Sequence, residues 1–121
     1  MPKLLIVDDE IDIREFAKNF FQKRGIQVFT AGGGSEAADI VANERPDLIL
    51  LDVRMEEMTG VEFLHGLRES EDKTRVIMVS GVEDEAIVTE AENLGIVGFI
   101  HKPLILGELH KVVMAELEKI V

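Results

Sequence analysis

Carboxylates follow directly after two short apolar runs of this sequence. Asp8 and Asp9 come after Lys3–Val7, and Asp52 comes after Leu48–Leu51. Taken one at a time, each aspartate could cap a helix or start a turn. Taken together at one place, three carboxylates repel one another, and their pKa values rise unless a cation is bound. Mg²⁺ prefers hard oxygen ligands at a partly open site, so these residues predict a magnesium site.

A hydroxyl and an ammonium follow two later apolar runs. Ser80–Gly81 comes after Arg75–Val79, and Lys102 lies just beyond Val97–Ile100. Read conservatively, Lys102 only neutralises the acids and Ser80–Gly81 is an ordinary turn. An ammonium, a hydroxyl, an accessible backbone N–H and a divalent cation together also form a cradle for a phosphoryl group. Phosphoryl transfer needs chiefly such charges, and a carboxylate can serve as its nucleophile.

The apolar runs predict the strands that position these groups. They are rich in Val, Ile and Leu, which is typical of strands covered by helices on both faces. The predicted strands are Lys3–Val7, Ile26–Thr30, Leu48–Leu51, Arg75–Val79 and Val97–Ile100. A helical pattern follows each one, which predicts an α/β fold: a doubly wound, five-stranded parallel sheet of flavodoxin-like order 2-1-3-4-5 with helices on both faces. In that order the carboxyl ends of strands 1, 3, 4 and 5 are neighbours, so the polar groups converge.

Local signals predict where some helices begin and what they bury. Ser35 is expected to cap the second helix, which must end before Pro46. The segment Thr59–Glu62 fits a capping box that opens the third helix. Phe16 and its neighbours form an apolar stripe on the first helix, and we expect them to pack in the core.

Composition limits the class of protein. With 121 residues, 46% of them hydrophobic, residues 1–121 are expected to form one domain, either a whole protein or the N-terminal part of a longer one. The sequence contains no cysteine, no signal peptide and no apolar run near the roughly 20 residues that span a membrane. A cytoplasmic location is therefore expected. The net charge of −11 argues against direct nucleic-acid binding by this domain.

Five spaced motifs together resemble the receiver domain of bacterial two-component response regulators. They are VDDE at 7–10, Asp52 after LILL, MTGVEFL at 58–64, VSG at 79–81 and HKP at 101–103. The resemblance covers the whole chain. It implies a phosphorylation-controlled signalling switch whose partner is a sensor histidine kinase or a histidine phosphotransfer protein.

The resemblance also implies a role for each residue of the acidic site. Asp52 would accept the phosphoryl group from a phosphohistidine, and Lys102 would pair with a phosphoryl oxygen. Mg²⁺ would be held by Asp9, by Asp52, by Asp8 through water and by the backbone carbonyl of Arg54. Such a domain catalyses its own phosphotransfer and dephosphorylation but turns over no separate substrate, so it is not an enzyme in the usual sense.

Further residues match the switch and the surroundings of the phosphoryl group. Ser80 would be the switch hydroxyl and Phe99 the switch aromatic. The Lys102–Pro103 bond would be cis. The fourth helix, fifth strand and fifth helix would form the output or dimer surface. The phosphoryl group would be flanked by Arg54, Gly81 and Val82, which leaves the phosphoryl lifetime open.

Departures from the family pattern keep other functions in view. Glu56 stands where many receivers have proline. We expect the loss of the proline ring to loosen the loop and the glutamate to add negative charge. One alternative is a docking module of the same fold that works without phosphorylation. A second is a Mg²⁺-dependent phosphohydrolase with an aspartate nucleophile. Such an enzyme needs another aspartate two residues after the nucleophile as its acid/base, and this chain has Arg54 there. A flavin carrier is rejected because the sequence after the first strand is acidic and the chain has no Trp or Tyr.

Overall fold

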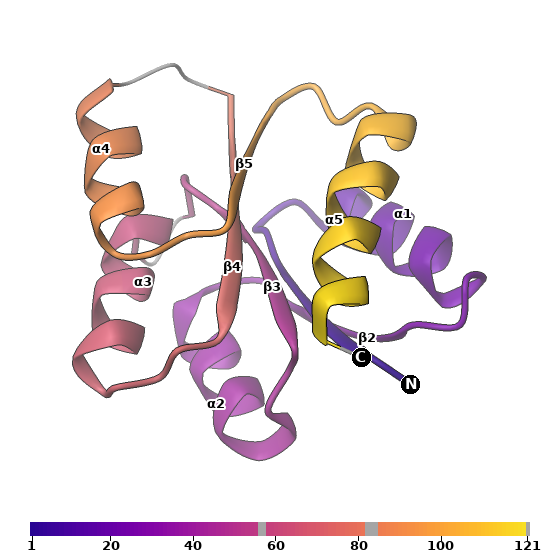
Figure 1. Cartoon of the computed structure of the whole chain (residues 1–121), viewed down its shortest axis with the longest axis horizontal. Coiled ribbons are helices and arrows are strands. Elements are labelled where there is room, and N and C mark those ends of the chain that lie inside the picture. The colour runs from indigo at the N-terminus through magenta and orange to yellow at the C-terminus, as the bar shows by residue number, and fades with distance from the viewer. Residues whose placement is uncertain (56–57, 82–84, 121) are drawn as a thin grey trace.

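Strands and helices alternate along the chain, and a helix follows every strand (Figure 1). The computed structural model describes residues 1–55, 58–81 and 85–120. The strands are β1 (Lys3–Val7), β2 (Gln27–Ala31), β3 (Leu48–Asp52), β4 (Arg75–Ser80) and β5 (Gly98–His101). The helices are α1 (Ile11–Gln22), α2 (Gly34–Glu44), α3 (Gly60–Glu69), α4 (Glu85–Asn93) and α5 (Leu106–Ile120). Within these described ranges, no helix is long and apolar enough to cross a membrane.

The five strands form one parallel sheet in the order β2-β1-β3-β4-β5. This confirms the predicted flavodoxin-like topology. In the register, Val7 of β1 lies beside Ala31 of β2 and Leu51 of β3, and Ser80 of β4 lies beside His101 of β5. The carboxyl ends of β1, β3, β4 and β5 therefore share one edge of the sheet, next to the point where the winding direction reverses.

Successive strand residues point to opposite faces, so the sheet has a core on each side. Leu5 and Val7 of β1 belong to the core beneath α2, α3 and α4. Leu4 and Ile6 belong to the core beneath α1 and α5. Figure 1 shows the same division, with α2, α3 and α4 on one side of the sheet and α1 and α5 on the other. Burial on both faces explains why the strand sequences read as continuous apolar runs.

Several local predictions can be compared with the structure. The Thr59–Glu62 capping box is confirmed, since Thr59 Oγ1 accepts from the Glu62 N–H at 3.1 Å and Glu62 Oε1 accepts from the Thr59 N–H at 3.3 Å. The prediction that Ser35 caps α2 was wrong, because α2 begins at Gly34 and Gly33 is its N-cap. The prediction that Phe16 packs in the core was also wrong, because its side chain is 50% exposed. β2 begins one residue later than predicted, at Gln27.

A single guanidinium joins the ends of α3 and α4. Arg68, in the last turn of α3, donates to the carbonyl of Leu94 at 2.7 Å and to that of Gly95 at 3.2 Å. Its other terminal nitrogen donates to the carbonyl of Asp72 at 2.8 Å. The carbonyls that follow α4 therefore find their donors on a neighbouring helix, which satisfies groups that a helix end leaves unpaired.

Candidate functional site

The sheet brings the predicted polar residues together at one edge. Asp52 and Ser80 are the last residues of β3 and β4, and Asp8 directly follows β1. Beyond β5, the Lys102 N–H donates to the Ser80 carbonyl at 2.8 Å, which extends the pairing of the two strands past their ends. The Lys102–Pro103 peptide bond is cis.

Lys102 lies at the centre of three carboxylates. Its Nζ is 3.2 Å from Asp52 Oδ2, 3.6 Å from Asp8 Oδ2 and 3.8 Å from Glu10 Oε1. Asp8 and Asp52 are buried, whereas Glu10 is exposed. The one ammonium thus offsets only part of the negative charge gathered around it.

The electrostatics of the site follow from this excess of acids. Burial raises the pKa of Asp8, and the charges of Asp52 and Asp9 raise it further. The hydrogen bond from the Glu10 N–H and the charge of Lys102 act in the opposite direction without cancelling the rise. For Lys102, burial lowers the pKa, but Asp52, Asp8 and Glu10 outweigh that effect, so the pKa is raised. The carboxylates therefore stabilise the Lys102 ammonium, whereas the charged form of the buried Asp8 carboxyl is disfavoured on balance.

The loop after β3 approaches Asp52 closely. The Gly60 N–H donates to the Val53 carbonyl at 2.8 Å, and a Cβ added to Gly60 would lie only 2.2 Å from the Asp52 carbonyl oxygen. The Arg54 N–H donates to Asp52 Oδ1 at 3.3 Å. The backbone therefore holds one oxygen of the Asp52 carboxylate, while Lys102 holds the other.

The structure also places the other residues that the sequence singled out. Ser80 is buried at the end of β4. Gly81 is exposed beside the Lys102 stem, with its added Cβ 3.7 Å from Lys102 Cβ. Phe99 is half-buried against the core beneath α2, α3 and α4, and its ring lies 5.1 Å from that of His101. Val82 and Glu56 lie outside the described residues.

The donor set at this edge fits a hard divalent cation. Asp8, Asp9 and Glu10 each offer a carboxylate oxygen, and these oxygens all lie within 4.8 Å of one another. Asp52 lies close to this cluster, because Asp52 and Asp8 both form ion pairs with Lys102 Nζ. Oxygen ligands, excess negative charge and partial exposure are the properties of a Mg²⁺ site.

Sequence reasoning missed two residues of this site. Glu10 was given no role in the metal site, although its side chain belongs to the carboxylate cluster. The signal available was its position directly after two aspartates at a strand end. Arg14 was not considered at all, yet its Nη1 donates to the Asp8 carbonyl at 2.7 Å. No pattern in the sequence links Arg14 to that carbonyl.

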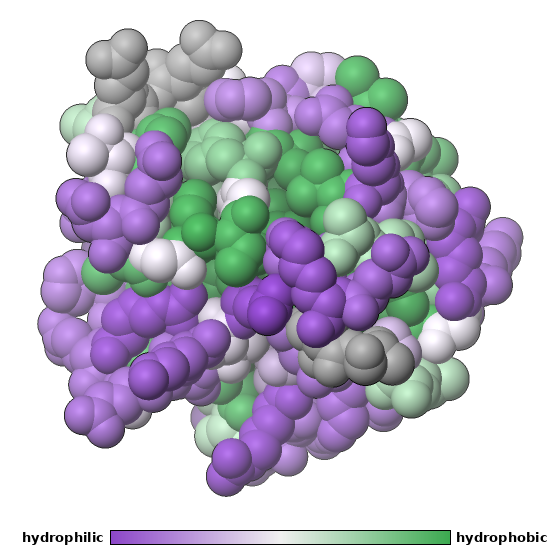
Figure 2. Space-filling view, in the orientation of Figure 1, coloured by the Kyte–Doolittle hydropathy of each residue, from purple (hydrophilic) through white to green (hydrophobic). Residues whose placement is uncertain are grey.

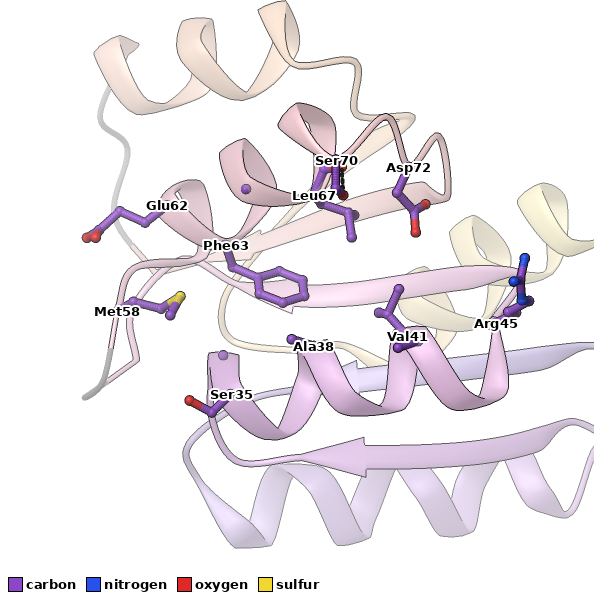
Figure 3. A pocket seen from close by; sticks show the side chains of 13 residues that line it. Ser35, Ala38, Val41, Arg45, Met58, Glu62, Phe63, Leu67, Ser70 and Asp72 are labelled. Atoms are coloured by element: carbon purple, nitrogen blue, oxygen red, sulfur yellow. Dashed lines mark hydrogen bonds between the residues drawn. The ribbon is translucent and has the colours of Figure 1, made fainter.

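A separate groove of about 690 Å³ lies between α2 and α3 (Figure 3). Its walls are largely apolar, with Val41 from α2 and Phe63 and Leu67 from α3. Met58 lies at one end and Arg45 at the other. None of the polar strand-end residues lines this groove, so it is distinct from the acidic site.

Comparison with known proteins identifies the family. Residues 4–114 match the family described as the response regulator receiver domain. The chain is 37% identical over 111 residues to sporulation initiation phosphotransferase F of Bacillus subtilis, covering 92% of this chain and 90% of that protein. It is 33% identical over 116 residues to the regulatory protein AtoC of Escherichia coli, covering 96% of this chain but only 25% of that protein.

Solved structures agree with these sequence matches. Chemotaxis protein CheY4 of Vibrio cholerae has a TM-score of 0.88 and 32% identity, covering 95% of this chain and 98% of that one. The receiver domain of the Francisella response regulator 1452 has a TM-score of 0.92 and 28% identity, with both chains fully covered. Response regulator TrrA of Thermotoga maritima, solved with Mg²⁺ and BeF, has a TM-score of 0.83 and 26% identity, covering 96% and 99%. The chain therefore belongs to the response regulator receiver domain family of two-component systems, and its function is that of a phosphorylation-controlled signalling switch.

Proposed function

We propose that Asp52 is the phosphoacceptor of this switch. The observation that carries the proposal is the position of its carboxylate. Asp52 is 4% exposed at the carboxyl end of the central strand, with one oxygen 3.2 Å from Lys102 Nζ and the other 3.3 Å from the Arg54 N–H. A carboxylate held at both oxygens is oriented for in-line attack. Its negative charge is stabilised by Lys102 until the donor arrives.

In the transfer step, a carboxylate oxygen of Asp52 attacks the phosphorus of a phosphohistidine. An O–P bond forms and the P–N bond breaks, and the electron pair leaves with the imidazole nitrogen, which takes up a proton. Lys102 then pairs with a phosphoryl oxygen, and Ser80 and the Gly81 N–H supply further donors. Loss of the phosphoryl group is the same chemistry with water as the nucleophile, so the domain catalyses both steps on itself.

The residues proposed to hold Mg²⁺ are Asp9 and Asp52 directly, Asp8 through water, and the backbone carbonyl of Arg54. When bound, the ion would neutralise charge on the phosphoryl oxygens. The cluster of Asp8, Asp9 and Glu10 carboxylates supports this assignment, because a bound cation would relieve the repulsion among three acids so close together. Glu10 is added to the predicted set as a fourth acid near the ion.

Ser80 and Phe99 are proposed to transmit the state of Asp52 to the surface. The Ser80 hydroxyl would move to bond the phosphoryl group, and the half-buried Phe99 ring would turn further inward. Because Phe99 lies on β5, this movement alters the surface formed by α4, β5 and α5. The flanking positions Arg54, Gly81 and Val82 are proposed to set how long the phosphoryl group survives.

That surface is the proposed site for an effector or a second copy of the chain. Figure 2 shows an apolar area over β5, bordered by hydrophilic residues of α4 and α5. Val97, directly before β5, is 38% exposed, and Ile105, directly before α5, is 60% exposed. Apolar side chains gathered within a polar rim are typical of interaction surfaces.

The phosphodonor is proposed to be a cytoplasmic sensor histidine kinase or histidine phosphotransfer protein.

A direct test uses a small acyl phosphate as the donor. Wild-type protein is incubated with this donor and Mg²⁺, and its intact mass is then measured. We expect one phosphoryl adduct, which is absent in Asp52→Asn and absent when the metal is chelated. Asp39→Asn serves as the matched control, since Asp39 is an exposed aspartate of α2. An adduct that survives in Asp52→Asn would contradict the assignment.

The same experiment decides between the remaining functions. A docking module that works without phosphorylation would give no adduct. A phosphohydrolase would also release phosphate from a separate phosphate ester added in place of the acyl phosphate, which a domain that acts only on itself would not turn over. This second outcome is disfavoured by Arg54, which stands two residues after Asp52 where such an enzyme needs an acid.

A further inference from the structure

We propose that Arg14, on α1, is a positioning residue for the carboxylates of Asp8 and Asp9. It acts through the backbone, because its Nη1 donates to the Asp8 carbonyl at 2.7 Å. Within the described part of the chain, no carboxylate lies within ion-pair distance of its guanidinium. The inference rests on the proposed Mg²⁺ site, to which it adds a residue that does not touch the ion.

The need for such a donor follows from where the strands end. The pairing of β1 with β2 ends at Val7 and Ala31. Asp8 lies one residue beyond that ladder, and it is only 3% exposed. A buried carbonyl without a hydrogen-bond donor is costly, and the guanidinium of α1 provides one. Arg14 therefore supplies a hydrogen-bond donor to the first carbonyl beyond the β1–β2 ladder.

Three hydrogen bonds together fix Asp8. Its N–H donates to the Ala31 carbonyl at 3.1 Å, its carbonyl accepts from Arg14, and its Oδ1 accepts from the Glu10 N–H at 2.9 Å. The Asp8 carbonyl belongs to the same planar peptide unit as the Asp9 N–H. Holding that carbonyl thus sets the direction in which the chain leaves β1, and with it the place of the Asp9 carboxylate.

Gly32 leaves the space that the guanidinium occupies. A Cβ added to Gly32 would lie 3.1 Å from Arg14 Nη1 and 3.5 Å from its Cζ. The backbone of Gly32 lies outside the left-handed region, so alanine is compatible with its conformation. The substitution Gly32→Ala therefore presses on Arg14 from the side of β2 while leaving its charge intact.

The test compares four variants with the wild-type protein. Mg²⁺ affinity is measured by isothermal titration calorimetry, and metal-free stability by urea unfolding. Removing a residue that orients metal ligands typically weakens metal binding by about 10- to 100-fold, so we expect about a tenfold loss in Arg14→Ala. Arg14→Lys, which keeps one donor, should fall between Arg14→Ala and wild type. Gly32→Ala should weaken binding in the same direction.

Arg24→Ala is the matched control. Arg24 lies in the turn that follows the same helix and also donates one hydrogen bond to a backbone carbonyl, that of Phe20, at 2.8 Å. Its loss removes the same charge and should leave Mg²⁺ affinity unchanged. In the metal-free protein, the NMR signals of the Asp9 and Glu10 amides should shift in Arg14→Ala but not in Arg24→Ala.

Arg14→Ala that is less stable than wild type but binds Mg²⁺ with wild-type affinity would overturn the inference, because the bond would then be only structural. An equal loss of affinity in Arg24→Ala would overturn it too, since the effect would come from net charge. If the wild-type protein itself binds no Mg²⁺, the proposed metal site fails, and that result is seen in the wild-type titration before any variant is compared.

Discussion

Replacing Lys102 by methionine should show how much its ammonium contributes to the free energy of unfolding through the carboxylates around it. Methionine keeps a stem of similar length and removes the charge. Lys102 Nζ is 3.2 Å from Asp52 Oδ2, where an effective dielectric constant of 20 gives a bare attraction of about 5 kcal/mol. Removing one partner of a buried ion pair costs about 3–5 kcal/mol. Because the Lys102 side chain is 21% exposed, water screens part of that loss, and we expect about 2 kcal/mol.

The loss should be measured by urea unfolding of the metal-free protein at neutral pH. For a chain of 121 residues, a loss of about 2 kcal/mol lowers the urea midpoint by about 1 M and the melting temperature by about 8 °C. Lys73→Met is the matched control, since Lys73 is an exposed lysine in the loop before β4. Its stability should equal that of the wild type.

The dependence on pH has a definite sign. The folded-state pKa of Lys102 is raised above 10.5, so its contribution to stability is fully present below 10.5 and is lost as the pH rises through the folded value. The folded-state pKa of Asp8 is raised above 3.8, so stability falls as the pH rises through that acidic window. Without Lys102 the pKa of Asp8 rises further. The deficit of Lys102→Met should therefore shrink toward pH 4 and again at strongly alkaline pH.

Bound Mg²⁺ should also reduce the deficit, because a cation among the same carboxylates replaces the missing charge. A variant as stable as wild type at neutral pH would refute this reasoning. So would a deficit that changes neither with pH nor with Mg²⁺, since it would then arise from packing of the stem.

Three further substitutions test other parts of the structure. Gly60→Ala places a Cβ 2.2 Å from the Asp52 carbonyl oxygen, so we expect strong destabilisation and loss of phosphorylation, measured by urea unfolding and intact mass. Arg68→Ala removes three hydrogen bonds from a half-buried guanidinium, so a loss of about 2 kcal/mol is expected, with faster hydrogen exchange at the amides around Leu94. Thr59→Ala removes a confirmed capping box and should cost about 1 kcal/mol in thermal unfolding, with little change in phosphorylation.

Each of these expectations can fail in its own way. Gly60→Ala with wild-type stability would mean that the loop moves away from Asp52 at little cost. Arg68→Ala with unchanged exchange near Leu94 would mean that water replaces the guanidinium there. Thr59→Ala with no loss of stability would mean that the start of α3 is held by packing alone.

The sheet and its polar edge could be predicted because both depend on the order of residues in the chain. Strands buried on both faces appear as apolar runs, and in a parallel sheet the residue after each run lies at one shared edge. The convergence of Asp8, Asp52 and Lys102 follows from that rule alone, and the structure places them as predicted. The start of α3 could be predicted for a similar reason, since a capping box is complete within four residues.

What could not be predicted depends on contacts distant in the sequence or on small rotations. The hydrogen bonds of Arg68 to carbonyls beyond α4 need both helices in place before the partner is known. Phe16 was misplaced for a different reason. At 100° per residue it lies about 140° around the helix from the buried Phe21, so a stripe that included both was too wide. Ser35 lost its expected capping role because three glycines before it allow α2 to start earlier.

The hydrogen bonds of Arg68 also hold one end of α4, which bears on the switch movement proposed above. Its guanidinium holds the chain at Leu94 and Gly95, whereas the other end of the helix is the one closer in sequence to Ser80. A displacement that starts at Ser80 would then tilt α4, with its first turn moving and its last turn held in place by Arg68. The helix has nine residues and is about 13 Å long, so a tilt of about 10° moves its other end by about 2 Å. The surface formed by α4, β5 and α5 would then be displaced most at the first turn of α4 and least at the end that Arg68 holds.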